Sequence, residues 1–181
     1  EMAVDFIMKV RELADKIGKQ THPLVQPPTI LIALIEGGSA TNLVPDTCKV
    51  TLTRRLLPCE NKEQAIKDYE DILAELAAKD PNFKADLHIW KGFRPPVEVP
   101  TDTKVVQVVK KAHQLVRGED LPFRGGEGGT DASHVVHMTG LPMPVYGPGD
   151  VTMTGCVDEN VPIDDVVDAV KVYALAIYYA L

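Results

Sequence analysis

A glycine-rich segment in the second half of the chain could contact an anion. Gly128, Gly129 and Thr130 precede Asp131, where the sequence predicts the start of a short helix. Unpaired backbone N–H groups at a helix start bind anionic groups readily. The alternative is a simple helix cap, because a Thr or Asp side chain at this place satisfies the same N–H groups. The two interpretations are compatible with each other.

Two adjacent arginines, Arg54 and Arg55, close a segment that alternates like a strand and could bind a carboxylate. The planar guanidinium carries a fork of donors that matches the two oxygens of a carboxylate. Neighbouring residues of a strand point to opposite faces of the sheet, so only one of the pair can reach a given ligand. The alternative is a solvated strand arginine.

The histidines and cysteines give less support for a metal site than the arginines give for a carboxylate site. His134 and His137 lie three residues apart on a predicted helix, a spacing that can share a metal ion, although a packing role is favoured. The cysteines are odd in number and show no C-x-x-C spacing, which favours a reducing cytoplasm and predicts no structural zinc site. They are Cys48, Cys59 and Cys156.

The bulk composition of the 181 residues is that of a globular protein, with 45% hydrophobic and 25% charged residues. The net charge of -7 argues against a nucleic-acid partner, which would need a concentrated surplus of Lys and Arg. We expect no signal sequence and no membrane span. The most apolar stretch, residues 166–181, contains Asp168 and Lys171 and is too short to cross a bilayer, so it predicts an amphipathic core helix.

Hydrophobic periodicity in the first 90 residues predicts the order helix, strand, strand, helix, strand. The expected helices span residues 4–17 and a segment that begins after Asn61, where Asn61 and Gln64 form a reciprocal cap. The expected strands are residues 30–35, 48–57 and 83–90. This order favours an α+β domain with two helices on one face of an antiparallel sheet.

The second half of the chain offers little sheet. A linker with three prolines, residues 91–102, precedes a helix over residues 103–116 and the short helix near Asp131. A short strand over residues 143–146 and a last helix that starts at Pro162 complete the pattern. These elements are too few for an α/β domain to close its own core.

Three segments, taken in order and spacing, carry a resemblance to a known family. The first is Gly37 to Asp46 with the strand that ends in Thr53, Arg54, Arg55, Leu56, Leu57 and Pro58. The second is Gly128 to Ala132, and the third is Tyr146 to Asp150 followed by Asp158 to Val161. Over nearly its whole length the chain resembles the dizinc amide-bond hydrolases that include acetylornithine deacetylase, succinyl-diaminopimelate desuccinylase, aminoacylase and carboxypeptidase G.

The resemblance implies a two-part architecture. Residues 1–92 resemble the ferredoxin-like lid that also forms the homodimer interface of the family. Residues 96–181 resemble the C-terminal segment of its α/β catalytic domain. We expect the first half of that catalytic domain to be absent from this sequence.

The resemblance also implies chemistry that depends on zinc. In the family, two zinc ions are held by a His-x-Asp pair and further carboxylates, zinc-bound water attacks the amide, and the first residue of a Glu-Glu pair is the general base. The sequence contains no His-x-Asp and no Glu-Glu. We therefore expect no catalytic residue, and no stoichiometric zinc pair, in this chain alone.

The substrate-binding residues of the family do have counterparts. Asn42 matches the asparagine that reaches from the lid toward the substrate. Arg55, thirteen residues on, matches the arginine that binds the substrate carboxylate, and Gly129 and Thr130 match a loop that contacts the substrate. The resemblance thus selects Arg55 over Arg54, and we expect Arg54→Ala to affect activity much less than Arg55→Ala.

One position departs from the family. Where the family carries its last histidine ligand, an alignment through Asp158 and Glu159 places Gly155, which has no side chain to bind a metal. Cys156, one residue along, is a possible soft ligand. The favoured interpretation of Cys156 is an apolar buried thiol, with one zinc site weakened or catalysis lost.

The sequence therefore predicts part of a zinc-dependent hydrolase that cleaves amide bonds of N-acyl amino acids or small peptides. This part would supply binding of a small carboxylate-bearing substrate, and dimerisation. The alternative is a catalytically inactive, truncated or degenerate homologue that acts only as a folded dimerisation module.

Overall fold

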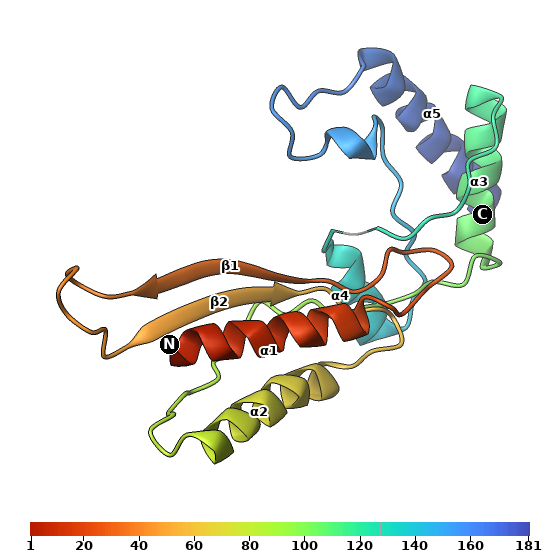
Figure 1. Ribbon diagram of the computed structural model, residues 1–181. Coiled ribbons are helices and arrows are strands. Elements are labelled where there is room, and N and C mark those ends of the chain that lie inside the picture. Colours follow the sequence, from red (N-terminus) through yellow and green to blue (C-terminus); the bar gives the residue numbers. More distant parts are fainter. Residues whose placement is uncertain (127) are drawn as a thin grey trace. The chain divides into compact units, whose positions relative to one another are not determined.

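A computed structural model describes residues 1–126 and 128–181 (Figure 1). The chain forms two compact units, Glu1–Pro96 and Val97–Leu181. Each unit has its own buried residues, and each is described by itself below.

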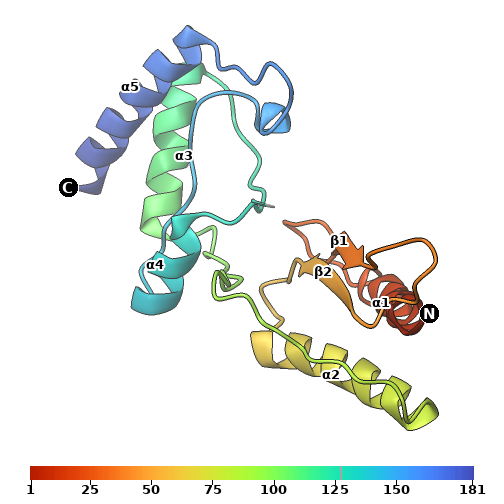
Figure 2. The same ribbon diagram turned by 90° about the vertical axis from the view of Figure 1, so that its left-hand side faces the viewer.

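The first unit contains two helices and a two-stranded ribbon. Helix α1 spans Met2–Ile17, strand β1 Ile30–Gly37, strand β2 Cys48–Arg54 and helix α2 Lys62–Lys79. The strands are antiparallel, from the pair Ile30 and Arg54 to the pair Gly37 and Cys48 at the hairpin end, with an irregularity between Ile32 and Leu34. Helix α1 packs against both strands and against α2 (Figures 1 and 2).

The core of this unit forms where the apolar faces of α1 and α2 meet. Val10 and, at helical spacing on α2, Tyr69, Ile72 and Leu76 are buried in one cluster. The helical periodicity of both segments is thereby confirmed. Partly buried side chains from the strands and loops complete the cluster: Phe6, Leu13, Ile30, Ile32, Leu52, Phe83 and Leu87.

The start of α2 is capped as the sequence predicts, but only from one side. The Asn61 side chain accepts a hydrogen bond from the Gln64 backbone N–H at 2.7 Å. The Gln64 side chain does not return to Asn61 and instead donates to Asp68 at 3.2 Å. The reciprocal half of the predicted cap is therefore wrong, because Asp68 offers Gln64 a charged acceptor one turn along the helix.

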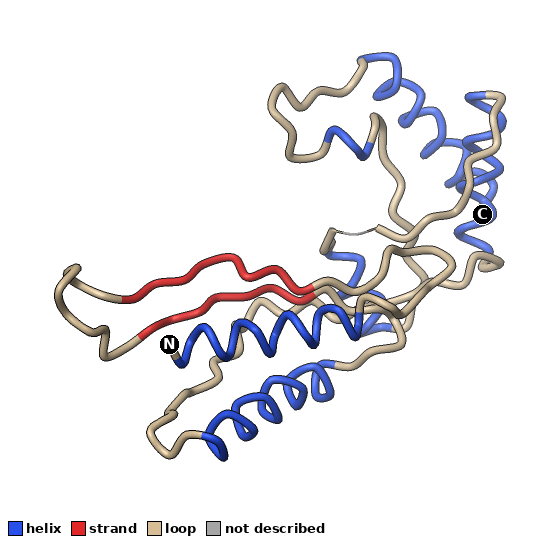
Figure 3. Tube along the Cα trace, in the orientation of Figure 1, coloured by secondary structure: helices blue, strands red, loops and turns tan. Residues whose placement is uncertain are grey.

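Two predicted strands are not formed. Residues 83–90 and 143–146 adopt no strand structure, and the described residues contain one sheet of two strands (Figure 3). The alternation of residues 83–90 instead reflects one-sided burial, because Phe83 and Leu87 pack against the helical core cluster without pairing with a strand. The unit is thus α+β, but its described elements do not show a ferredoxin-like topology.

The second unit is built on two packed helices. Helix α3 spans Lys104–Arg117 and helix α5 Ile163–Ala180, while α4, Asp131–Thr139, and a 3-10 turn, Val151–Met153, lie between them. Helices α3 and α5 bury Val106, Ala112, Ala169 and Val172. Arg117 at the end of α3 pairs with Asp165 at 2.8 Å and with Asp168 at 3.0 Å.

No strand occurs in the described residues of this unit, in keeping with the small amount of sheet that the sequence offers. Across the described residues, no helix combines the length and the apolar composition that a membrane span requires.

Candidate functional site

Arg54 is an almost buried arginine in a network of two carboxylates. Its side chain is 7% exposed, and its two terminal nitrogens lie 2.6 Å from Asp68 Oδ2 and 2.8 Å from Glu60 Oε1. Burial alone lowers the pKa of Arg54, but the hydrogen bonds to Asp68 and Glu60 outweigh it and raise the pKa above its ordinary value. A guanidinium committed to two protein carboxylates is not available to a substrate.

Arg55, its neighbour, is exposed. Its backbone N–H donates to the carbonyl oxygen of Thr29 at 2.9 Å, so strand pairing continues one residue beyond β2. The burial of one arginine and the exposure of the next follow the alternation expected for a strand. Of the two arginines, Arg55 is therefore the one that can meet a ligand from solvent.

Figure 1 shows the loop that joins β1 to β2 at the hairpin end of the ribbon. Asn42 belongs to this loop and is exposed. Arg55 lies at the other end. A strand rises roughly 3.3 Å per residue, so the seven steps from Cys48 to Arg55 correspond to roughly 23 Å. The structure does not bring Asn42 and Arg55 of one chain together.

The predicted anion-contacting loop leads directly into α4. Thr130 is the N-cap residue, with extended backbone angles, and its side chain makes no cap hydrogen bond. Gly129 and Thr130 are both exposed. The Thr130 side chain therefore does not cap α4, and its backbone carbonyl accepts a hydrogen bond from the Ser133 N–H at 3.1 Å.

The Gly147-Pro148-Gly149 turn is structural. Gly149 has a φ of 84°, in the region that favours glycine. A Cβ at this position would meet Cγ2 of Val161 at 3.0 Å. The turn thus closes against the residues that lead into α5.

The segment that departs from the family forms a tight loop. Gly155 has a φ of 76°, and its N–H donates to Glu159 Oε2 at 2.9 Å. Cys156 is exposed, with its sulfur donating to the Thr152 carbonyl at 3.3 Å. The predicted buried thiol is therefore wrong. The 3-10 turn at Val151–Met153, which precedes this loop, likewise contains no buried residue.

The described residues do not fit a metal ion. Among them, no three His, Cys, Asp or Glu side chains converge on one point. His134 and His137 are exposed on α4. A dizinc centre needs several such ligands around one cavity, so any metal would have to be held mainly by residues other than these.

His113 is a buried histidine for which the sequence predicted no role. It is buried on α3, with Nδ1 2.8 Å from the Tyr146 hydroxyl and Nε2 3.8 Å from Glu119 Oε1. Tyr173 donates its own hydroxyl to the Tyr146 carbonyl at 2.7 Å, and burial raises the pKa of Tyr146. Helical spacing could have predicted the burial of His113, because it lies seven residues after the buried Val106 and therefore on the same face of α3.

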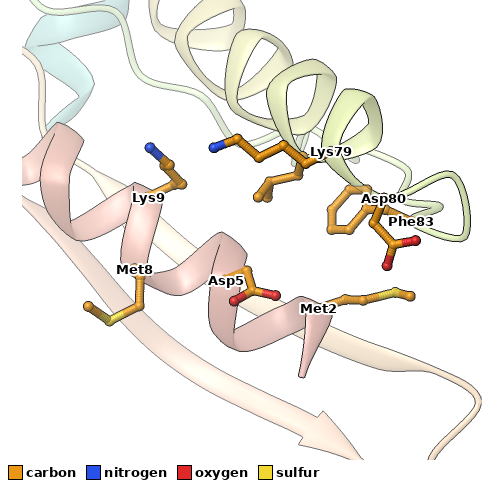
Figure 4. A pocket seen from close by; sticks show the side chains of 8 residues that line it. Met2, Asp5, Met8, Lys9, Lys79, Asp80 and Phe83 are labelled. Carbon is orange, nitrogen blue, oxygen red and sulfur yellow. The ribbon is translucent and has the colours of Figure 1, made fainter.

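A pocket of about 260 Å³ lies between α1 and the end of α2 (Figure 4). Its cations are already paired: Lys9 lies 3.0 Å from Glu12 and 3.1 Å from Glu75, and Lys79 lies 2.6 Å from Glu75. The pocket contains none of the predicted site residues. Its lining residues are Met2, Asp5, Met8, Lys9, Leu76, Lys79, Asp80 and Phe83.

Comparison with known families decides what the first unit is. Residues 1–81 match the family described as the peptidase dimerisation domain of M20 peptidases. These residues are an M20 peptidase dimerisation domain. The helix α1, the ribbon and α2 all fall within the matched M20 domain.

Similarity to known proteins extends beyond the M20 domain. The chain is 30% identical to an acetylornithine deacetylase of Myxococcus xanthus over 154 residues, which are 84% of this chain and 38% of that protein. It is 28% identical to the N-formyl-4-amino-5-aminomethyl-2-methylpyrimidine deformylase of Bacillus subtilis over 171 residues, 84% of this chain and 39% of that protein. The chain is thus a distant homologue of these enzymes and spans less than two fifths of their length.

A solved structure has the same fold. An M20 family metallo-carboxypeptidase from Sulfolobus solfataricus superposes with a TM-score of 0.68 at 21% identity, over 98% of this chain and 45% of that protein. The chain therefore shares its fold with part of an M20 family metallo-carboxypeptidase.

Proposed function

We propose that this chain supplies the dimerising, carboxylate-binding part of a zinc-dependent hydrolase that cleaves amide bonds of N-acyl amino acids or small peptides. The observation that carries the proposal is the exposure of Arg55 at the end of the M20 ribbon, beside an Arg54 that is sequestered by two carboxylates. The names of the two similar enzymes support cleavage of an N-acyl bond, because one describes removal of an acetyl group and the other removal of a formyl group.

In this proposal Arg55 binds the substrate carboxylate through the paired donors of its guanidinium. Gly129 and Thr130 contact the substrate through backbone N–H groups at the start of α4, where Thr130 makes no side-chain cap. Asn42 provides a side-chain amide from the hairpin loop. Each of these groups is proposed as a substrate contact in its own right, and no described residue is proposed as an acid, a base or a nucleophile.

The match to the peptidase dimerisation domain supports dimerisation, which is the first expected result. Among the described residues no further strand pairs with either edge of the ribbon, and its exposed apolar residues Leu31, Leu34 and Ile35 favour a partner. We further propose that the dimeric lid has the ferredoxin-like arrangement of the family.

Light scattering after size exclusion tests dimerisation and should give twice the mass of one chain. A single species with the mass of one chain at high micromolar concentration would argue against the proposal.

The separation of Asn42 from Arg55 sets a second requirement. The length of β2 alone, roughly 23 Å from Cys48 to Arg55, exceeds the span of a small substrate, so we propose that the Asn42 and Arg55 of one site come from different chains of the dimer.

Mixing two variants tests this requirement. In the chain joined to the N-terminal half of a relative, Asn42→Ala and Arg55→Ala should each lose substrate binding alone. An equal mixture should regain about a quarter of the sites, because half of the dimers are mixed and one of their two sites is intact. If the mixture after subunit exchange is no better than either variant, Asn42 does not act across the dimer.

Zinc, in this proposal, is held by residues that correspond to the remainder of the longer relatives. Helix α5 supports a larger catalytic domain, because it exposes an apolar stripe at helical spacing that a packed domain would cover. The stripe consists of Ile163, Val167, Val170 and Ile177. We expect the 181-residue chain alone to show no stoichiometric zinc pair by elemental analysis, and no amidase activity.

Gly155 predicts a weakened zinc site even in the joined protein. We expect Gly155→His to raise zinc affinity, because it supplies the imidazole that the family carries at this position. The structure has room for the side chain, since a Cβ at Gly155 meets no atom within 4 Å. A left-handed backbone at a non-glycine residue should also lower the free energy of unfolding by about 1–2 kcal/mol. Zinc titration and urea denaturation measure the two effects. The opposite pattern, in which Gly155→His changes nothing and Cys156→Ala abolishes zinc binding, would identify Cys156 as the ligand.

One observation favours a second candidate, a dimerisation module without catalysis. The loop at Gly155 is closed by Glu159 and presents no imidazole. Zinc content and amidase activity of the joined protein separate the two candidates. In either case we propose a cytoplasmic location, which the odd number of free cysteines supports.

A further inference from the structure

The Arg54 network holds the chain on both sides of Arg55. On the N-terminal side, the two terminal nitrogens of Arg54 pair with Asp68 on α2 and with Glu60. On the C-terminal side, the backbone N–H of Leu57 donates to the second carboxylate oxygen of Glu60 at 2.8 Å. Leu57 is itself only 2% exposed. Glu60 therefore links the residues that precede and follow Arg55.

The strand partner supplies a third restraint. The Arg55 N–H is bonded to Thr29, while the preceding pair of the ladder joins Arg54 to Ile30. The backbone of Arg55 is thus restrained from the sheet, from α2 and from the turn that precedes α2. An exposed arginine side chain loses conformational entropy when it binds a ligand. Because the backbone of Arg55 is already fixed before binding, only its side chain has to be ordered when the ligand binds.

Stability alone does not explain a buried ion network at this place. Apolar residues of similar volume often hold two elements together as well as, or better than, a buried ion pair. A forked guanidinium between two carboxylates differs in being directional, because its hydrogen bonds are formed in one orientation. The network is suited to fix the orientation of the strand end as well as its contact with α2.

We propose that Arg54, with Glu60 and Asp68, is a positioning residue that orients Arg55 toward the substrate carboxylate. The inference rests on the carboxylate-binding role proposed for Arg55. It assigns a function to both arginines of the pair, with one fixing the strand end and the other contacting the ligand.

Titration of the 181-residue chain with N-acetylglycine, followed through the Nε–Hε resonance of Arg55, tests the proposal. Asp68→Asn and Arg54→Lys each remove part of the network and retain a polar side chain, and Glu60→Gln is a third variant that leaves the Asp68 pair in place. We expect each to weaken N-acetylglycine binding by at least about threefold, since small misplacements of a binding group are costly.

Two controls separate positioning from stability. Lys67→Gln removes an exposed ion pair between two residues of α2, Lys67 and Asp71. Ile72→Val removes a methyl group from the core cluster that α2 forms with α1. Both should bind N-acetylglycine like the unaltered chain, although Ile72→Val lowers the unfolding free energy. Binding in the three network variants that equals that of these controls would overturn the positioning role, as would an equal weakening in Ile72→Val.

The failure of the proposed function would look different. If the Arg55 resonance of the unaltered chain shows no saturable shift, or if calorimetry shows that Arg55→Gln still binds N-acetylglycine equally well, the carboxylate role of Arg55 itself is wrong.

Discussion

Arg55→Ala, in the chain joined to the N-terminal half of a relative such as the Myxococcus xanthus deacetylase, is expected to lower kcat/KM on an N-acyl amino acid by about 30- to 1,000-fold. This range corresponds to about 2–4 kcal/mol, the loss typical when one partner of a desolvated, charge-assisted pair is removed. The physical reason is that the substrate carboxylate would be bound without its counter-charge. Steady-state kinetics measures the effect, and calorimetric binding replaces it if turnover is too slow.

Lys49→Ala is the matched control for this variant. Lys49 is a basic residue on the same strand, is 74% exposed and pairs with Glu36 on β1 at 3.1 Å. Its removal should change kcat/KM little. Equal losses in Lys49→Ala and Arg55→Ala would show a general effect of charge instead of a specific contact. Arg54→Ala, which the sequence alone presented as the control, is unsuitable because Arg54 belongs to the buried network.

Arg54→Ala is expected to lower the free energy of unfolding by about 3–5 kcal/mol, because it leaves the partly buried Glu60 and Asp68 without their cation. Their side chains are 14% and 23% exposed. Domains of this size have only about 5–15 kcal/mol of stability in total. Urea denaturation followed by circular dichroism provides the measurement.

Lys67→Ala is the comparison for the stability measurement. Lys67 pairs with Asp71 on α2 at 3.0 Å, and both side chains are largely exposed. Exposed pairs of this kind contribute about 0–1 kcal/mol. A loss in Arg54→Ala that is no larger than the loss in Lys67→Ala would mean that the network is solvent-screened and does not hold β2 to α2.

The sequence predicted the elements that bury a continuous apolar face. Helical spacing identified α1 and α2, and the same spacing brings Val10 against Ile72 and Leu76. The apolar run at residues 30–35 identified β1 by its composition, although Leu31, Leu34 and Ile35 of that strand are exposed in the structure. The two helix predictions succeeded because burial on one face leaves a period in the sequence.

Period alone did not distinguish a paired strand from an extended segment packed on one side. Phe83 and Leu87 alternate like strand residues, but they pack against the helical core cluster without pairing with a strand. Whether a segment pairs depends on which strand edge lies beside it, and that is a property of the tertiary arrangement.

Only part of the candidate site could be predicted from the sequence, because the rest depends on tertiary contacts. Alternation separated Arg54 from Arg55, but it did not say which of the two is buried. That choice depends on Glu60 and Asp68, which lie six and fourteen residues away and meet Arg54 only in the folded unit. The exposure of Cys156 likewise depends on the path of a loop, which its apolar neighbours in sequence do not reveal.

Carboxylate recognition by Arg55 is tested most directly with two ligands that differ only in charge. Calorimetry on the joined protein would compare an N-acyl amino acid with its carboxamide, in the unaltered protein and in Arg55→Ala. We predict that the unaltered protein binds the carboxylate more tightly by about 2 kcal/mol or more and that Arg55→Ala loses this preference. A preference for the carboxylate that is unchanged in Arg55→Ala would contradict the proposal.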